Sequence, residues 1–145
     1  MSDNNNEISF VDTNIFLYAY DSSLPTKQSI ASKLIKELWI NRSGCLSVQV
    51  LQELYVNLTR KIRTPLSIAE ARQIVSDLNQ WQCFVPDGLS IIGATEIQER
   101  YNISFWDAMI VYSAKCLYCK ILWSEDLNHN QFYSGVKAIN PYKQK

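Results

Sequence analysis

Short apolar segments with the pattern of buried strands alternate with amphipathic helical segments along most of this chain of 145 residues. The strand pattern occurs at 8–11, 45–48, 83–86, 120–124 and 135–139. The helical pattern begins at about residue 14 and returns over 23–40, 49–62, 67–81, 90–102 and 104–119. Such alternation is typical of a mostly parallel sheet of about four to five strands with helices on both faces. The sequence therefore predicts an α/β fold.

The length fits one domain, which we expect to span residues 1–145. The first seven residues, MSDNNNE, are polar and are expected to be a flexible N-terminus rather than a signal or transit peptide. No apolar run approaches the length that crosses a membrane. We therefore expect a soluble protein of the cytoplasm.

The formal net charge is zero, whereas proteins that bind nucleic acid constitutively usually carry an excess of Lys and Arg. A local basic patch remains possible, and Arg60, Lys61 and Arg63 in TRKIRT are the candidates for contact with RNA. The alternative is a solvated helix end, where cations interact favourably with the helix dipole. Composition does not decide between the two.

The four cysteines and the one histidine of the chain are candidate zinc ligands. Cys116 and Cys119 have C-x-x-C spacing, but they lie in a helical pattern and no second C-x-x-C follows. Cys45 and Cys83 lie in strand patterns. Reduced, buried cysteines explain these positions better than a zinc site does.

Carboxylates occur where the strands end and the following helices begin. Asp12 follows the first strand, Asp126 follows the fourth, Glu53 lies in the helix after the second, and Asp107 lies in the first turn of a strongly apolar helix. Each has an ordinary structural interpretation as well. Asp12 and Asp126 suit helix caps, Glu53 suits a surface ion pair, and Ser104 with Asp107 resembles a capping box.

Ligands of doubly wound sheets bind beyond the carboxyl ends of the strands, where all four acids are expected to converge. Four carboxylates at one place repel each other and raise their pKa values. A divalent cation removes that cost, and the hard ions Mg²⁺ and Mn²⁺ prefer oxygen ligands. The acids therefore predict a metal site.

In order along the chain, FVDTNIFLYAYD, the Glu of SVQVLQELY, SFWDAMIV and LWSEDL resemble the acidic motifs of the PIN-domain family, and most closely those of VapC-type toxins. The resemblance extends from about Ile8 to Ile139. It implies an α/β/α sandwich and a metal-dependent ribonuclease that uses Mg²⁺ or Mn²⁺. It also implies a cognate antitoxin, and it makes Asn14 and Ser124 polar helpers of the acids.

On this interpretation Asp12 and Asp107 are direct metal ligands, and Asp126 binds metal or orients water. Glu53 binds a second ion or a metal-bound water, and Asn14 and Ser124 hold these groups in position. A bound metal ion activates water and polarises a phosphoryl oxygen without a protein base. His129 is therefore interpreted as a solvated loop residue.

Two alternatives are open. A haloacid-dehalogenase-like phosphatase also has an Asp after its first strand, but it needs a second Asp where this chain has Asn14. A non-catalytic RNA-binding or interaction module of the same fold usually loses acids, and all four are present. The abundance of aromatic residues, including Trp39, Trp81, Trp106 and Trp123, together with the resemblance, predicts a homodimer.

Overall fold

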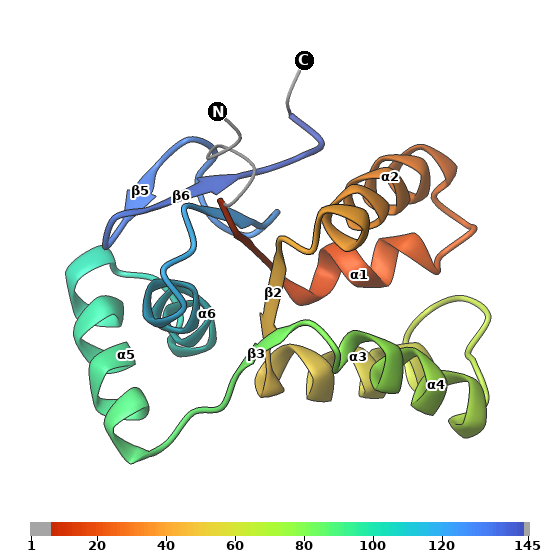
Figure 1. Cartoon of the computed structure of the whole chain (residues 1–145), viewed down its shortest axis with the longest axis horizontal. Coiled ribbons are helices and arrows are strands. Elements are labelled where there is room, and N and C mark those ends of the chain that lie inside the picture. The colour runs from red at the N-terminus through yellow and green to blue at the C-terminus, as the bar shows by residue number, and fades with distance from the viewer. Residues whose placement is uncertain (1–6, 144–145) are drawn as a thin grey trace.

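The structure is a computed structural model that describes residues 7–143; the predicted flexible N-terminus falls almost wholly outside this range. Within it, strands and helices alternate as predicted, around one mixed sheet (Figure 1). The strands are β1 (Ser9–Val11), β2 (Gly44–Ser47), β3 (Gln82–Phe84), β4 (Ile121–Trp123), β5 (Phe132–Tyr133) and β6 (Val136–Ile139). The helices are α1 (Thr13–Ala19), α2 (Pro25–Asn41), α3 (Val48–Arg60), α4 (Ile68–Leu78), α5 (Gly88–Tyr101) and α6 (Phe105–Cys116).

The sheet has the strand order β3-β2-β1-β4-β6-β5, and only β5 runs antiparallel to its neighbour. The central strand β1 pairs with β2 on one side and β4 on the other, so that Phe10 lies opposite both Cys45 and Leu122. Because these strands are parallel, the residues that follow β1, β2 and β4 emerge at the same edge of the sheet.

The prediction of a mostly parallel α/β sheet is confirmed, but the structure has one strand more than the upper limit of the predicted range. The additional strand, β5, contains two residues and pairs with β6 through a tight turn. Phe132 is exposed and Tyr133 is buried, which is the alternation of a strand. Two residues are too few for this alternation to be detected in a sequence.

The helices cover both faces of the sheet. Helices α5 and α6 lie on one side and α1 and α2 on the other, with α3 and α4 packed together beside α1 (Figure 1). Helix α6 is the innermost, because it contacts β2, β3, β4 and β6 and carries a run of buried residues from Ala108 to Val111. Its predicted burial is confirmed.

Helix α3 shows how the apolar pattern is used. Its apolar residues Val50, Leu51, Leu54 and Leu58 lie on one face and are all buried. Ser47, the last residue of β2, caps the helix by accepting a hydrogen bond from the backbone N–H of Val50. The end of β2 and the first turn of α3 are thereby fixed to each other.

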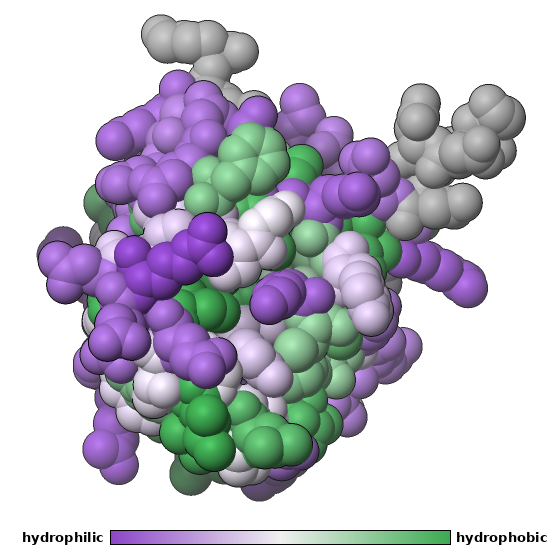
Figure 2. Space-filling model, turned by 90° about the vertical axis from the view of Figure 1, so that its left-hand side faces the viewer, coloured by the Kyte–Doolittle hydropathy of each residue, from purple (hydrophilic) through white to green (hydrophobic). Residues whose placement is uncertain are grey.

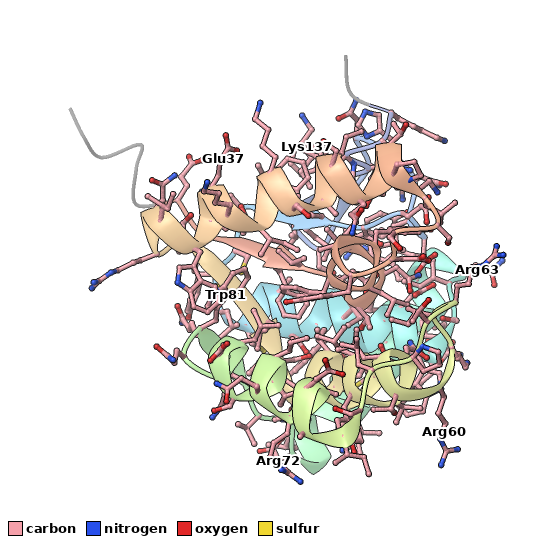
Figure 3. All side chains as sticks on the ribbon, turned by 90° about the vertical axis from the view of Figure 1, so that its right-hand side faces the viewer. Glu37, Arg60, Arg63, Arg72, Trp81 and Lys137 are labelled. Atoms are coloured by element: carbon pink, nitrogen blue, oxygen red, sulfur yellow. The ribbon has the colours of Figure 1, made fainter. Side chains whose placement is uncertain are left out.

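Gly44, at the start of β2, allows the indole of Trp81 to approach the sheet. A Cβ atom at this position would collide with the ring of Trp81 (Figure 3). That ring contacts the rings of both Phe16 and Trp39. Any larger residue at position 44 would therefore displace this aromatic cluster.

Within residues 7–143, no helix combines the length and the apolar character needed to cross a bilayer.

Candidate metal centre

Asp12 lies at the junction of β1 and α1, and it is both a helix cap and a member of the acidic site. Its Oδ1 accepts a hydrogen bond from the backbone N–H of Thr13 over 2.7 Å, and its Oδ2 accepts one from the hydroxyl of Ser124 over 2.9 Å. Only 6% of Asp12 is exposed. The interpretation of Asp12 as a helix cap and its interpretation as an acid of a metal site are therefore compatible.

Asp107 is the third residue of α6. Its backbone N–H donates a hydrogen bond to the hydroxyl of Ser104, which is the N-cap. In α4, by contrast, both halves of a capping box between Ser67 and Glu70 are formed. In α6 only the half contributed by Ser104 is formed, which leaves the partly buried Asp107 carboxylate facing other acids.

Asp126 lies in the loop after β4. No helix begins there in the described chain, so the interpretation of Asp126 as a helix cap is wrong. Its backbone N–H donates to the hydroxyl of Ser124 over 3.1 Å, and the side chain of Asn14 donates to its Oδ2 over 3.4 Å. Ser124 thus holds the loop, and Asn14 contacts the carboxylate.

Three of the predicted acids converge. One carboxylate oxygen from each of Asp12, Asp107 and Asp126 lies within 4.8 Å of the other two. Ligand oxygens lie about 2.1 Å from a bound Mg²⁺, so two of them are at most about 4.2 Å apart. A cation would fit among these oxygens after only small movements of the side chains. The donor set, which consists of carboxylates alone, suits a hard divalent ion.

The pKa values of these three acids are raised, mainly by burial. Loss of solvation raises the pKa of Asp12 from 3.8 to about 7, although hydrogen bonds from Ser124 and Thr13 oppose the change. Desolvation, followed by the charge of Glu53, raises the pKa of Asp107 against an opposing hydrogen bond with Ser104. Desolvation and then the charge of Asp107 raise the pKa of Asp126. The mutual repulsion expected from the sequence is therefore present, but it is secondary to burial.

Glu53 is close enough to act on these acids electrostatically, but it is held by other groups. Its Oε1 accepts a hydrogen bond from the hydroxyl of Thr13 over 2.6 Å, and its Oε2 accepts one from the side chain of Gln49 over 3.1 Å. No Lys or Arg among residues 7–143 pairs with Glu53, so the alternative of a surface ion pair is not found there. Glu53 thus borders the three-acid cluster, linked to α1 through Thr13.

Thr13 and Gln49 are two residues that the sequence analysis did not identify. Thr13 follows Asp12 directly, and Gln49 precedes Glu53 by one helical turn, so its position could have been inferred from the spacing of residues on one helix face. Glu125, the acid directly before Asp126, has a different role. Glu125 turns away from the cluster, accepts a hydrogen bond from Tyr18 and pairs with Lys27.

The remaining candidates lie outside this centre. Arg60 and Arg63 extend into solvent from the end of α3 and the loop after it (Figure 3), and Lys61 between them is also exposed. His129 is not fully solvated as expected, because its Nδ1 accepts a hydrogen bond from the backbone N–H of Asn140. Among residues 7–143, no cysteine or histidine belongs to a group that could hold a metal.

The geometry agrees with what comparisons with known proteins show. The family model of the PIN domain matches residues 9–134. The chain belongs to the PIN domain family. This membership removes the haloacid-dehalogenase alternative. No curated protein sequence matches the chain significantly.

Solved structures share the fold at low sequence identity. A toxin–antitoxin complex from Klebsiella pneumoniae matches with a TM-score of 0.68 and 14% identity, over 94% of this chain and 99% of that chain. VapC20 from Mycobacterium tuberculosis, described as a toxin that cleaves the sarcin–ricin loop, matches with a TM-score of 0.61 and 17% identity, over 81% and 89%. The DNA-bound VapBC from Salmonella typhimurium matches with a TM-score of 0.62 and 17% identity, over 91% and 96%. Together they support the α/β PIN fold of this chain.

Proposed function

We propose that this PIN protein is a metal-dependent endoribonuclease that hydrolyses RNA phosphodiester bonds. The observation that carries the proposal is the convergence of Asp12, Asp107 and Asp126, whose carboxylate oxygens lie within 4.8 Å of one another. Like-charged carboxylates held this close together, with Asp12 buried, are unfavourable for folding unless something compensates for them, which is typical of a site that binds a cation.

The chain supplies the ligands and holds them in position. Asp12 and Asp107 bind Mg²⁺ or Mn²⁺, and Asp126 either completes this site or orients water. Glu53 holds a second ion or a water bound to the first. A divalent ion supplies an activated water and neutralises charge that develops on the phosphate. Ser124 and Asn14 fix the carboxylates through the hydrogen bonds described above.

RNA suits the surroundings of this centre. Trp106 directly precedes Asp107 and is 61% exposed, so its ring is available to stack on an unpaired base beside the scissile phosphate. Arg60, Lys61 and Arg63 provide exposed positive charge at the far end of α3 for a flanking phosphate. The zero net charge means that these local contacts, rather than a general attraction, select the substrate.

The biological role that fits best is that of the toxin of a type II toxin–antitoxin pair in the cytoplasm. The support is the PIN family membership together with the fold shared with toxin–antitoxin complexes and with a toxin described as cleaving an RNA loop. The protein would then form a homodimer and bind an antitoxin. Exposed apolar residues are available for such contacts from the end of β3 into α5, namely Val85, Leu89, Ile91 and Ile92. Figure 2 views the side of the molecule that carries α5, and apolar residues, coloured green, gather over the lower part of this side.

The decisive experiment measures cleavage of RNA by the purified protein in Mn²⁺, in Mg²⁺ and in chelator. We expect cleavage only with metal, and a loss of at least about 100-fold in Asp12→Asn or Asp107→Asn. Asp21→Asn is the matched control, because Asp21 is a loop acid whose carboxylate, within residues 7–143, bonds only to Ser23. Cleavage by a folded Asp107→Asn protein at the wild-type rate would contradict the assignment. Absence of both cleavage and metal-dependent stabilisation would favour the non-catalytic module instead.

A further inference from the structure

Gln49 is a polar side chain in an apolar position. It lies in the first turn of α3, between the N-cap Ser47 and the buried Val50, and only 7% of it is exposed. Glutamine is seldom buried this deeply unless its amide has specific partners. The residue therefore calls for an explanation beyond helix formation.

The amide of Gln49 contacts two parts of the candidate metal centre. Its Nε2 donates a hydrogen bond to Oε2 of Glu53 over 3.1 Å and another to the backbone carbonyl of Trp106 over 3.3 Å. The nitrogen carries two hydrogens, one for each acceptor, so the orientation of the amide is determined. Glu53 lies one helical turn further along the same face of α3, and Trp106 is the residue before Asp107.

Both carboxylate oxygens of Glu53 therefore accept hydrogen bonds from the side chains of other residues. Thr13 of α1 donates to Oε1 over 2.6 Å, while Gln49 donates to Oε2. The same amide joins the first turn of α3 to the first turn of α6. Two helices that carry acids of the site are therefore tied together by one side chain.

The arrangement leaves a polar atom without a partner. Oε1 of Gln49 is buried and accepts no hydrogen bond from the described part of the chain. A buried acceptor without a donor is unfavourable for folding, and an apolar residue of similar size would avoid this cost. The side chain is thus better explained by what its Nε2 holds than by a contribution to the core.

We propose that Gln49 is a positioning residue of the metal centre, which fixes the Glu53 carboxylate and the start of α6 relative to each other. This inference rests on the proposed metal-dependent nuclease function. It adds a residue that takes no part in the chemistry itself but acts through Glu53.

A double-mutant cycle with Glu53 tests the inference. Gln49→Met keeps the size of the side chain but removes both donors. We expect Gln49→Met to lower kcat and weaken Mn²⁺ binding by about tenfold, the lower end of the range for residues that support metal ligands, with KM for RNA nearly unchanged. In the Glu53→Gln background the same change should have little further effect, because its target is already lost. Melting without metal should be unchanged or higher.

Gln52→Met is the matched control, because Gln52 lies in the same helix, is exposed and should tolerate the change. Equal losses from Gln49→Met in the two backgrounds, or a wild-type kcat and Mn²⁺ affinity, would overturn the inference. If Gln49→Met does not fold, Gln49→Asn, which is too short to reach both acceptors, takes its place in the cycle.

The Mn²⁺ titrations separate this inference from the proposed function. If wild type binds Mn²⁺ but cleaves no RNA, the nuclease proposal fails while the cycle still tests Gln49 through binding. If wild type cleaves RNA and the cycle is additive, only the role of Gln49 fails.

Discussion

The hydroxyl of Ser124 donates a hydrogen bond to Oδ2 of Asp12 across the ends of two neighbouring parallel strands, over 2.9 Å. The hydroxyl oxygen of Ser124 in turn accepts a hydrogen bond from the backbone N–H of Asp126 over 3.1 Å. Ser124 is fully buried, so water does not compete for these bonds. One hydroxyl therefore connects two acids of the centre, and it stabilises the ionised form of Asp12.

Ser124→Ala should make metal binding and cleavage more dependent on pH. Without the hydroxyl, the pKa of Asp12 should rise further above its wild-type value of about 7. We expect activity at neutral pH to fall about tenfold and to recover in part toward pH 9, as Asp12 loses its proton. The measurement is a pH profile of cleavage at fixed Mn²⁺.

Ser113→Ala is the control for this prediction. Ser113 is also buried, but its hydroxyl bonds to the carbonyl of Met109 within α6. The pH profile of cleavage by Ser113→Ala should keep the wild-type shape. A uniform loss in Ser124→Ala at all pH values would mean that the hydroxyl supports the fold rather than the ionisation of Asp12.

The metal-free protein should lose stability as pH rises from about 4 to about 7. The pKa of Asp12 is raised in the folded state from 3.8 to about 7, so the folded state binds more protons than the unfolded state within this window. The raised pKa values of Asp107 and Asp126 act in the same direction. At 1.36 kcal/mol per pKa unit, the change between pH 5 and pH 8 is on the order of 2 kcal/mol.

Denaturant unfolding in chelator at these two pH values measures the effect. Asp12→Asn should remove most of the slope, since the amide does not titrate. In excess Mn²⁺ the slope should reverse, because protons compete with the ion for the carboxylates. Stability that rises with pH in chelator would show that Asp12 is ionised without difficulty in the folded protein.

The convergence of Asp12, Asp107 and Asp126 was predictable because it follows from topology. Parallel strands bring their carboxyl ends to one edge, so an acid after β1 and an acid after β4 must be neighbours there. The apolar pattern of 104–119 predicted a buried helix, which carries Asp107 to the same place. No side-chain geometry was needed for either inference.

The partners of these acids were not predictable in the same way, because they depend on side-chain conformation. Glu53 was expected in the helix after the second strand, and the structure shows that Thr13 and Gln49 hold its carboxylate. His129 was expected in solvent, yet it anchors its loop to Asn140 after β6. The contacts of Thr13 with Glu53 and of His129 with Asn140 join different segments and leave no periodic pattern in the sequence, whereas Gln49 and Glu53 have the spacing of neighbours on one helix face.

Glu125 and Asp126 are adjacent acids that should respond differently to neutralisation. Asp126→Asn removes a carboxylate of the cluster and should weaken Mn²⁺ binding by about tenfold or more. Glu125→Gln removes the partner of Lys27 and Tyr18 and should leave Mn²⁺ affinity nearly unchanged. Calorimetric titration of the two folded proteins measures the difference. The opposite order would mean that the loop after β4 binds metal through Glu125.

Trp106→Ala should weaken the binding of single-stranded RNA without abolishing catalysis. Stacking of a base on an aromatic side chain contributes about 1–3 kcal/mol, so KM should rise by at least about fivefold while kcat changes less. Trp106→Phe should retain part of the effect. Trp39→Ala serves as the control, since Trp39 is a partly exposed indole on α2. An unchanged KM in Trp106→Ala would remove the stacking role.

Asp107→Asn distinguishes a metal ligand from a helix cap by the sign of its effect on stability. If Asp107 mainly supported the start of α6, the metal-free variant would be less stable by about 0.3–1 kcal/mol. The pKa of Asp107 is instead raised, first by burial and also by the charge of Glu53, so its ionised form is unfavourable there. We therefore expect the metal-free variant to be as stable as wild type or more stable.

Bound metal should reverse the order of stability of wild type and Asp107→Asn. Wild type gains stability as the Mn²⁺ concentration exceeds its Kd, whereas the variant gains little. Thermal melts of both proteins in chelator and in excess Mn²⁺ measure the two differences. Glu70→Gln is the matched control, because Glu70 occupies the same third helical position after a Ser cap in α4 but is exposed. It should lower stability slightly in both conditions. If Asp107→Asn behaves in the same way as Glu70→Gln, Asp107 is a cap, and the metal assignment of Asp12 loses its nearest support.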